Sequence, residues 1–145
     1  MIVVVDTNIV FSAILSSEGK INDLLLNPGL AFHFYTPTFL IEELEKHHEK
    51  LKKISGLKDD DIKFLKRTVF NHIDFIDPEI IRPESWEKGF DLVKDIDEND
   101  TPFVALCLDI NGSLWTGDKK LSNGLKQKGI DWIWTTDELL AEREK

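Results

Sequence analysis

Apolar and polar residues follow one another along this chain in a pattern that predicts short buried strands separated by amphipathic helices. The opening run from Ile2 to Val5 consists only of β-branched residues, which is typical of a strand buried on both faces of a sheet. Similar short runs predict further strands over residues 31–35, 75–76, 113–116 and 131–134.

Helical spacing of apolar residues fills the intervals between these strands. It begins directly after Asp6 and continues to Leu15. Pro37 begins a predicted long helix that reaches residue 54 and carries His47 on its apolar stripe. The segment 55–58 ends that helix, and three aspartates at 59–61 favour the start of the next. Further helices are predicted over residues 84–96, 100–109, 119–128 and 137–144.

The alternation of strands and helices defines the expected fold. It predicts an α/β protein with right-handed crossovers, a mainly parallel central sheet and helices on both faces of that sheet. The chain of 145 residues contains no repeat, low-complexity tract or Gly/Ser linker, so we expect one domain over residues 1–145.

The composition of the chain indicates its cellular location. No apolar stretch reaches the roughly 18 residues that a membrane span needs, so no membrane association is expected. Asp6 interrupts the N-terminal apolar run where a signal peptide would continue it. The single cysteine, Cys107, excludes an internal disulfide and suits a reducing environment. These observations predict a cytoplasmic protein.

The charge is acidic overall but unevenly distributed. Eighteen Lys and Arg against twenty-seven Asp and Glu give a formal charge of −9, which on average argues against a nucleic-acid partner. Residues 46–67 nevertheless hold eight basic and four acidic residues, whereas residues 68–100 hold three basic and ten acidic ones. The basic helical pair over 46–67 fits either an RNA phosphate backbone or a solvated surface. Its candidate RNA-binding residues are Lys46, Lys50, Lys53, Lys63, Lys66 and Arg67.

Four acidic residues stand where a parallel sheet gathers its functional groups, outside the carboxyl ends of the strands. Asp6 directly follows the first strand, and Asp118 follows the strand over 113–116. Glu43 lies about two turns into the helix after the second strand, and Asp100 begins the apolar helix that precedes the strand leading to Asp118. We expect these four side chains to converge on one small volume.

Carboxylates a few ångströms apart repel one another unless a cation lies among them. A hard divalent ion such as Mg²⁺ prefers oxygen ligands and keeps several waters, so one or two direct carboxylates suffice. Such an ion polarises a phosphate oxygen and activates a bound water, so the cluster predicts metal-assisted hydrolysis of a phosphodiester. Thr7, Asn8 and Thr116 fit as neighbours that orient carboxylates or hold a metal-bound water.

The same residues also fit purely structural roles. Asp6, Asp100 and Asp118 are each well placed to cap the helix that follows them, because aspartate commonly accepts hydrogen bonds from a first helical turn. Glu42 is an alternative to its neighbour Glu43. Asn8 fits equally well as a residue that satisfies the local backbone at a helix start.

The acidic residues lie in four short segments whose order and spacing are distinctive. The segments are Val-Val-Val-Asp-Thr-Asn-Ile at 3–9, Thr-Pro-Thr-Phe-Leu-Ile-Glu-Glu-Leu at 36–44, Asp-Glu-Asn-Asp-Thr-Pro-Phe-Val-Ala-Leu at 97–106 and Leu-Trp-Thr-Gly-Asp-Lys-Lys-Leu at 114–121. Together they resemble a PIN domain, in particular the small prokaryotic VapC-like toxins, and the resemblance runs nearly end to end. It implies a three-layer α/β/α fold with a Rossmann-like sheet and a protruding helical pair.

The resemblance also implies an activity and its residues. It implies a ribonuclease, in particular an endonuclease, that depends on Mg²⁺ or Mn²⁺ and leaves 5′-phosphate and 3′-hydroxyl ends. Position by position it implies catalytic roles for Asp6, Glu43, Asp100 and Asp118, of which the three aspartates hold the metal. Asp97 matches a more variable supporting acid one turn earlier. The resemblance further implies the toxin component of a toxin–antitoxin system, with a protein antitoxin that meets the helical pair, and a homodimer.

Other Mg²⁺ enzymes on similar sheets fit less well. Haloacid-dehalogenase-like phosphatases need a second aspartate two residues after the first, where this chain has Asn8. Receiver domains need a phospho-acceptor aspartate after a central strand and a lysine after the last one, and neither is evident. The alternative that stays open is a PIN fold with weak or no catalysis that binds RNA or a protein partner.

Overall fold

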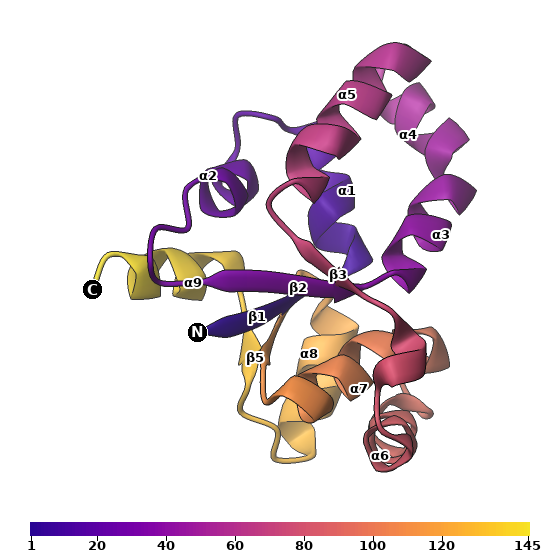
Figure 1. Cartoon of the computed structure of the whole chain (residues 1–145), viewed down its shortest axis with the longest axis vertical. Helices are drawn as coiled ribbons and strands as arrows, with labels where there is room; N and C mark the ends of the chain where they lie inside the picture. Colours follow the sequence, from indigo (N-terminus) through magenta and orange to yellow (C-terminus); the bar gives the residue numbers. More distant parts are fainter.

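Five parallel strands form one sheet at the centre of the protein (Figure 1). The structure is a computed structural model and describes all residues from 1 to 145. The strands are β1 (Ile2–Val5), β2 (His33–Pro37), β3 (Asp74–Ile76), β4 (Ser113–Trp115) and β5 (Ile133–Trp134). They lie in the order β3-β2-β1-β4-β5, so the chain builds outward from β1 on one side and then crosses to the other. The prediction of a parallel sheet is confirmed, because every pairing is parallel.

β1 occupies the centre of the sheet because its residues are apolar on both faces. Val3, Val4 and Val5 have no exposed surface, as expected for a strand covered on both sides. β1 pairs with β2 on one side and with β4 on the other, where Val5 lies beside Trp115. The residues that follow β1 and β4 therefore leave the sheet at the same edge.

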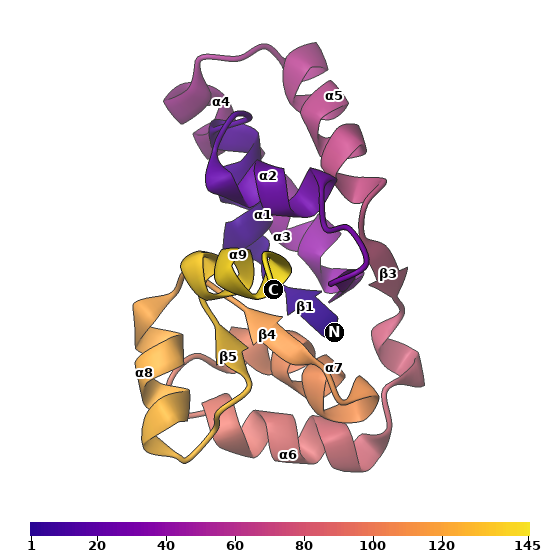
Figure 2. The ribbon, with the colours of Figure 1, turned by 90° about the vertical axis from the view of Figure 1, so that its left-hand side faces the viewer.

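Helices cover both faces of the sheet, which gives the three-layer α/β/α arrangement. Figures 1 and 2 show one layer with α1 (Thr7–Leu15), α2 (Lys20–Leu26), α5 (Asp59–Phe70) and α9 (Thr136–Arg143). The layer on the opposite face consists of α6 (Pro83–Val93), α7 (Thr101–Ile110) and α8 (Lys119–Gln127). Two short 3₁₀ helices, η1 (Pro78–Ile80) and η2 (Glu98–Asp100), precede α6 and α7. None of the helices combines the length and the apolar character needed to cross a membrane.

A helical arm rises away from the sheet, as Figure 1 shows. It is formed by α3 (Phe39–Lys46), α4 (His48–Ser55) and α5. Gly56 ends α4 in the left-handed conformation, with φ of 70°, and its N–H donates to Lys52 O at 2.9 Å. α5 then begins at Asp59, so the predicted helix stop and the predicted new helix are both confirmed.

Two local predictions were wrong, and one helix was not predicted. Pro37 does not begin a helix but is the last residue of β2, a strand that also starts two residues later than predicted. The helix predicted over 37–54 is divided at His47, whose backbone (φ −103°, ψ 11°) lies outside the helical region. α2 was not predicted at all; Asn22 ties it to α1 by donating to Ala13 O and to Ser16 O at 2.5 and 2.9 Å.

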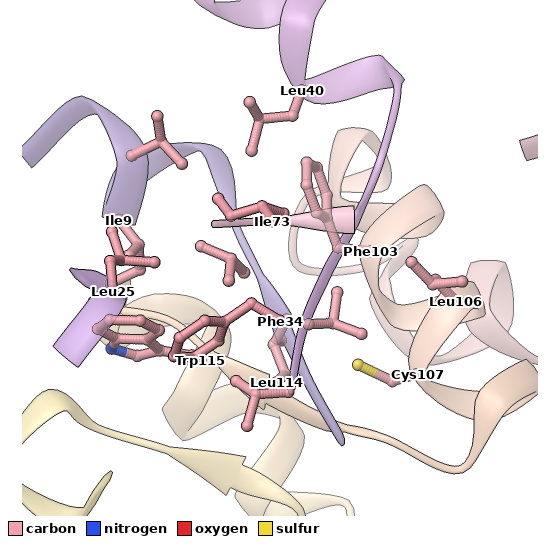
Figure 3. Packing of buried hydrophobic residues seen from close by; sticks show 14 of the residues in the cluster. Ile9, Leu25, Phe34, Leu40, Ile73, Phe103, Leu106, Cys107, Leu114 and Trp115 are labelled. Carbon is pink, nitrogen blue, oxygen red and sulfur yellow. The ribbon is translucent and has the colours of Figure 1, made fainter. Parts of the chain in front are cut away.

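A cluster of 30 buried apolar residues joins both helical layers to the sheet. Figure 3 shows Phe34 and Trp115 packed together within it, with their ring centroids 5.6 Å apart. Burying a side chain of this size contributes on the order of 2 kcal/mol or more. Trp115 also donates its indole N–H to Thr136 Oγ1 at 3.0 Å. This packing fixes the strand ends from which the candidate site residues leave.

Candidate functional site

Two aspartates leave the sheet at the point where its strand order reverses. The chain runs from β1 to one side and from β4 to the other, and ligands bind α/β sheets at such a switch point. Asp6 follows β1, and its N–H donates to Trp115 O at 3.3 Å, which extends the ladder to β4. Asp118 follows β4 after Thr116 and Gly117. The topology therefore brings both carboxyl groups to the same edge.

Both aspartates also cap helices, as one alternative interpretation expected. One carboxylate oxygen of Asp6 accepts from the N–H of Ile9 at 3.0 Å, and one of Asp118 accepts from the N–H of Leu121 at 3.2 Å. These bonds hold each carboxyl group in a fixed orientation at a strand end. Capping and a functional role are thus compatible at these two positions.

Asp100 stands at the N-terminus of α7 but does not cap it. Its side chain makes no capping hydrogen bond, and its Oδ2 is buried without any hydrogen-bond partner. A buried polar atom without a partner is costly, so a position that keeps one calls for a ligand, water or proton. The capping interpretation of Asp100 was therefore wrong.

A polar cavity of about 240 Å³ brings the acidic residues together. The predicted residues that line it are Asp6, Thr7, Asn8, Glu43, Asp97, Asp100 and Asp118. Thr116 does not line the cavity; it is buried, and its hydroxyl accepts from the N–H of Asp118 at 3.1 Å. Asp97 lies at the rim, where its carboxylate accepts from the N–H of Asn99 at 3.0 Å.

Glu43, and not Glu42, faces this cavity. Glu43 is half-buried on α3 and accepts a short hydrogen bond from the hydroxyl of Thr7, the first residue of α1. Glu42 is exposed and does not line the cavity. The rotation of α3 over the sheet edge thus decides between two neighbouring acids.

Burial raises the pKa of three of these carboxyl groups. The pKa of Asp6 is raised to about 6, mainly because burial disfavours the ionised form, while a hydrogen bond with the Thr116 side chain works in the opposite direction. The pKa of Asp100 is raised to about 7 by burial and then by the negative charge of Asp97 and of the other acids. Burial also raises the pKa of Glu43. Basic side chains act only on Glu43, whose pKa Lys46 and His47 lower, so the charges of Asp6 and Asp100 have no basic partner among the causes of their shifts.

The chemistry of these donors fits a hard divalent cation held partly through water. Nowhere do three His, Cys, Asp or Glu side chains lie close enough to ligate one ion directly. Mg²⁺ commonly binds through one or two carboxylates and keeps several waters, so the spacing suits that ion better than a closed set of protein ligands. The unpartnered Oδ2 of Asp100 supplies a ligand atom that nothing else engages.

Three further residues line the cavity that the sequence did not assign to it, namely His47, Asn99 and Phe103. His47 was expected on the partly buried stripe of a long helix, but it is exposed at the break between α3 and α4. Its ring lies edge-on to that of Phe11, with centroids 6.4 Å apart. Asn99 lies between Asp97 and Asp100 in the segment 97–106, and this position beside the predicted acids could have identified it as a site residue.

The candidate RNA-binding residues lie along the helical arm. Lys46 is on α3, Lys50 and Lys53 are on α4, and the remaining three, Lys63, Lys66 and Arg67, are on α5. Five of them are exposed. Lys66 is largely covered and pairs with Glu45 at 3.2 Å, which makes it the least available of the six.

Comparison with known proteins agrees with the resemblance to PIN domains that the sequence shows. The PIN domain family model matches residues 4–144, a range that includes all four clustered acids. No curated protein matches the chain at a significant level. Among solved structures, a chain from VapBC2 of Rickettsia felis, bound to a DNA fragment from their promoter, is similar over 93% of this chain and 98% of its own length, with a TM-score of 0.67 and 16% identity. At that identity the likeness concerns the fold, whereas the sequence match extends nearly end to end. The chain therefore belongs to the PIN domain family.

Proposed function

We propose that the protein is a ribonuclease that cuts RNA internally with Mg²⁺ or Mn²⁺ as its cofactor. PIN domains are generally nucleases, which supports a nuclease here. The observation that carries the proposal is the buried, unpartnered Oδ2 of Asp100, a residue that lines a cavity together with three other acids of the predicted cluster. Such a set repels itself, and a divalent cation is the ligand that relieves the repulsion.

Each residue of the cluster has a proposed role that follows from its position. Asp6, Asp100 and Asp118 are proposed to hold the cation, because their carboxyl groups surround the cavity from two strand ends and a helix start. When bound, the cation polarises the phosphodiester and promotes attack by water at phosphorus. Glu43, held by Thr7, orients water or a phosphate oxygen at the wall that α3 forms. Asn8, Asp97 and Thr116 keep these carboxylates in position.

The proposal extends to a biological role. A VapBC2 structure has the same fold, which supports a toxin that is paired with a protein antitoxin. A homodimer and a cytoplasmic location are part of the same proposal. The helical arm, which stands clear of the sheet, is the surface proposed to meet RNA or the antitoxin.

A metal-dependent cleavage assay tests the activity. Pooled single-stranded RNAs are incubated with the protein in Mg²⁺, Mn²⁺ or EDTA, and the ends of the products are mapped. We expect internal cuts with 5′-phosphate and 3′-hydroxyl ends in either metal and none in EDTA. Asp6→Asn should lower the rate by at least about 100-fold, the scale of losing a group that stabilises the transition state.

Asp77→Asn provides a matched control. Asp77 also caps a helix, accepting from the N–H of Glu79 at 2.9 Å, but it is exposed and outside the cavity. Its asparagine variant should cleave like the wild type. No cleavage in either metal, or equal rates for the wild type and Asp6→Asn, would contradict the proposal.

A further inference from the structure

Two cavities of opposite character flank the acidic cavity. One of about 750 Å³ shares Asn99 with it and is lined by three glutamates beside aromatic and proline residues: Glu79, Glu87 and Glu98 with Trp86, Phe90, Pro78 and Pro83. The other, of about 390 Å³, begins at Thr116 and Gly117, the residues that lead into Asp118. A single turn of chain therefore separates this second cavity from the proposed metal ligands.

The second cavity has the donors that phosphate groups require. No hydrophobic residue lines it, and its wall contains Lys119, Lys126, Ser122, Asn123, Thr135 and Thr136. Lysine, hydroxyl and amide groups are typical contacts of nucleic-acid phosphates. The one acidic residue in the wall, Asp137, pairs with Lys20 at 3.2 Å. A protein partner would instead require apolar or aromatic anchors, which this wall lacks.

All the charged residues of the helix that borders this cavity are lysines. Residues 119–128 contain four lysines and no acidic residue. Lys128 is engaged by Asp95, whereas Lys119, Lys120 and Lys126 are exposed and take part in no ion pair. On the helical arm, Lys52 and Lys66 are held by carboxylates, whereas Lys53 and Lys63 are exposed and take part in no ion pair. α8 packs against β5, so its lysines have a fixed position relative to the sheet edge (Figure 2).

We infer that the cavity bordered by α8 and the start of α9 binds backbone phosphates of the RNA strand next to the bond that is cut. This inference rests on the proposed function and names the path by which its substrate reaches the acids. A polyanionic strand is repelled by the glutamate-lined cavity and attracted by the lysine-lined one. The strand therefore enters along α8, and Lys119 and Lys126 hold phosphates adjacent to Asp118.

Three double variants that remove the same charge test the inference. Lys119→Gln/Lys126→Gln alters the cavity, Lys53→Gln/Lys63→Gln alters the arm, and Lys88→Gln/Lys94→Gln alters two exposed lysines on α6 and at its C-terminal cap. Binding of a fluorescein-labelled single-stranded RNA is measured by anisotropy in Mg²⁺ at several salt concentrations, in an Asp6→Asn background that prevents cleavage. Thermal melting of each variant, followed by tryptophan fluorescence, establishes that it is folded.

The cavity variant should lose the most affinity. Loss of two phosphate contacts reduces the slope of log K against log salt by about 1.4 for a single strand, and affinity at low salt should fall about tenfold or more. With Asp6 restored, KM should rise while kcat changes little, because these lysines hold neighbouring phosphates that do not themselves react. The α6 variant should bind and cleave like its parent.

Each other outcome has a definite meaning. If the wild type cleaves RNA but the cavity variant keeps the parental salt slope and KM, the inference is wrong and the proposed function stands. Equal losses of affinity in the cavity and α6 variants would show that net charge alone explains the effect, and the inference would be wrong. A loss of affinity confined to the arm variant would also overturn the inference. If the wild type neither binds nor cleaves RNA, the proposed function fails and the inference fails with it.

Discussion

Replacing Asp6 with asparagine should make the metal-free protein more stable, although it removes a residue of the proposed active site. Asparagine caps helices as well as aspartate does, so the bond to the N–H of Ile9 survives the change. The two side chains are nearly equal in volume, so the buried surroundings need not rearrange. What disappears is a negative charge that lies buried among other acids.

The magnitude follows from the raised pKa of Asp6. The carboxyl has a pKa of 3.8 in the unfolded chain and about 6 in the folded one. As pH rises above 3.8 the unfolded state loses its proton first, so rising pH favours unfolding until it passes about 6 and the penalty becomes constant. At about 1.4 kcal/mol per pKa unit, the penalty is about 3 kcal/mol at pH 8 and about half of that at pH 5. Asp6→Asn removes it at both pH values.

Urea unfolding in EDTA measures the effect, with the fluorescence of the four tryptophans as the signal. Asp6→Asn should raise the free energy of unfolding by about 3 kcal/mol at pH 8 and by about half as much at pH 5, with an unchanged m-value. Asp77→Asn, an exposed capping position, should change it by less than about 0.5 kcal/mol at either pH. An Asp6→Asn variant that is no more stable than the wild type at pH 8, or that gains equally at both pH values, would refute the reasoning.

Metal binding, helix packing and helix capping each allow a further prediction. Mg²⁺ at about ten times its dissociation constant should stabilise the wild type by about 1.4 kcal/mol in a melting experiment, and Asp118→Asn should reduce that gain. Gly89→Val should destabilise the protein by about 2 kcal/mol in urea, because even a Cβ there would lie 3.0 Å from the backbone N of Ala105 and would separate α6 from α7. Thr135→Ala should cost about 1 kcal/mol in the same assay, since it removes the capping box of α9.

The parts of the fold that the sequence predicted well are those with a strong local signal. The β-branched run of β1 admits only a buried strand, and the strand ends that follow from it predict that Asp6 and Asp118 lie at one edge. Gly56 marked the end of α4 because a left-handed residue there favours glycine. Each of these positions is determined by its own neighbours in the chain.

The wrong predictions arise where local patterns have two meanings. The apolar stripe through Leu44 and Leu51 continues across His47 without a change in period, so periodicity could not show that the helix bends away there. Pro37 suits a first helical turn as well as a strand end, and parallel pairing beside Ile76 decided for the strand. α2 is only seven residues long, and it is held by packing and by Asn22, which the sequence alone does not reveal.

In the candidate site, too, local signals predicted some residues, whereas tertiary contacts determined others. Its acids could be named from strand ends and from family resemblance, but the choice of Glu43 over Glu42 needed the rotation of α3. The unpartnered oxygen of Asp100 depends on burial by distant elements. The sequence did not indicate a role for the lysines of α8, because the cavity beside Asp118 is created by the approach of α9. Contacts between segments remote in sequence are the information that the sequence did not supply.

One residue separates a structural from a functional interpretation of the acidic cavity. If Asp6 were only a helix cap, asparagine would still remove its buried charge and stabilise the metal-free protein, but cleavage would stay constant, since both residues cap equally well. If Asp6 holds a cation, the charge that destabilises the metal-free protein is the same charge that binds the ion. The variant must then gain stability above pH 6 and lose cleavage together. A gain without a loss, or a loss without a gain, would mean that the buried charge and the reaction belong to different groups.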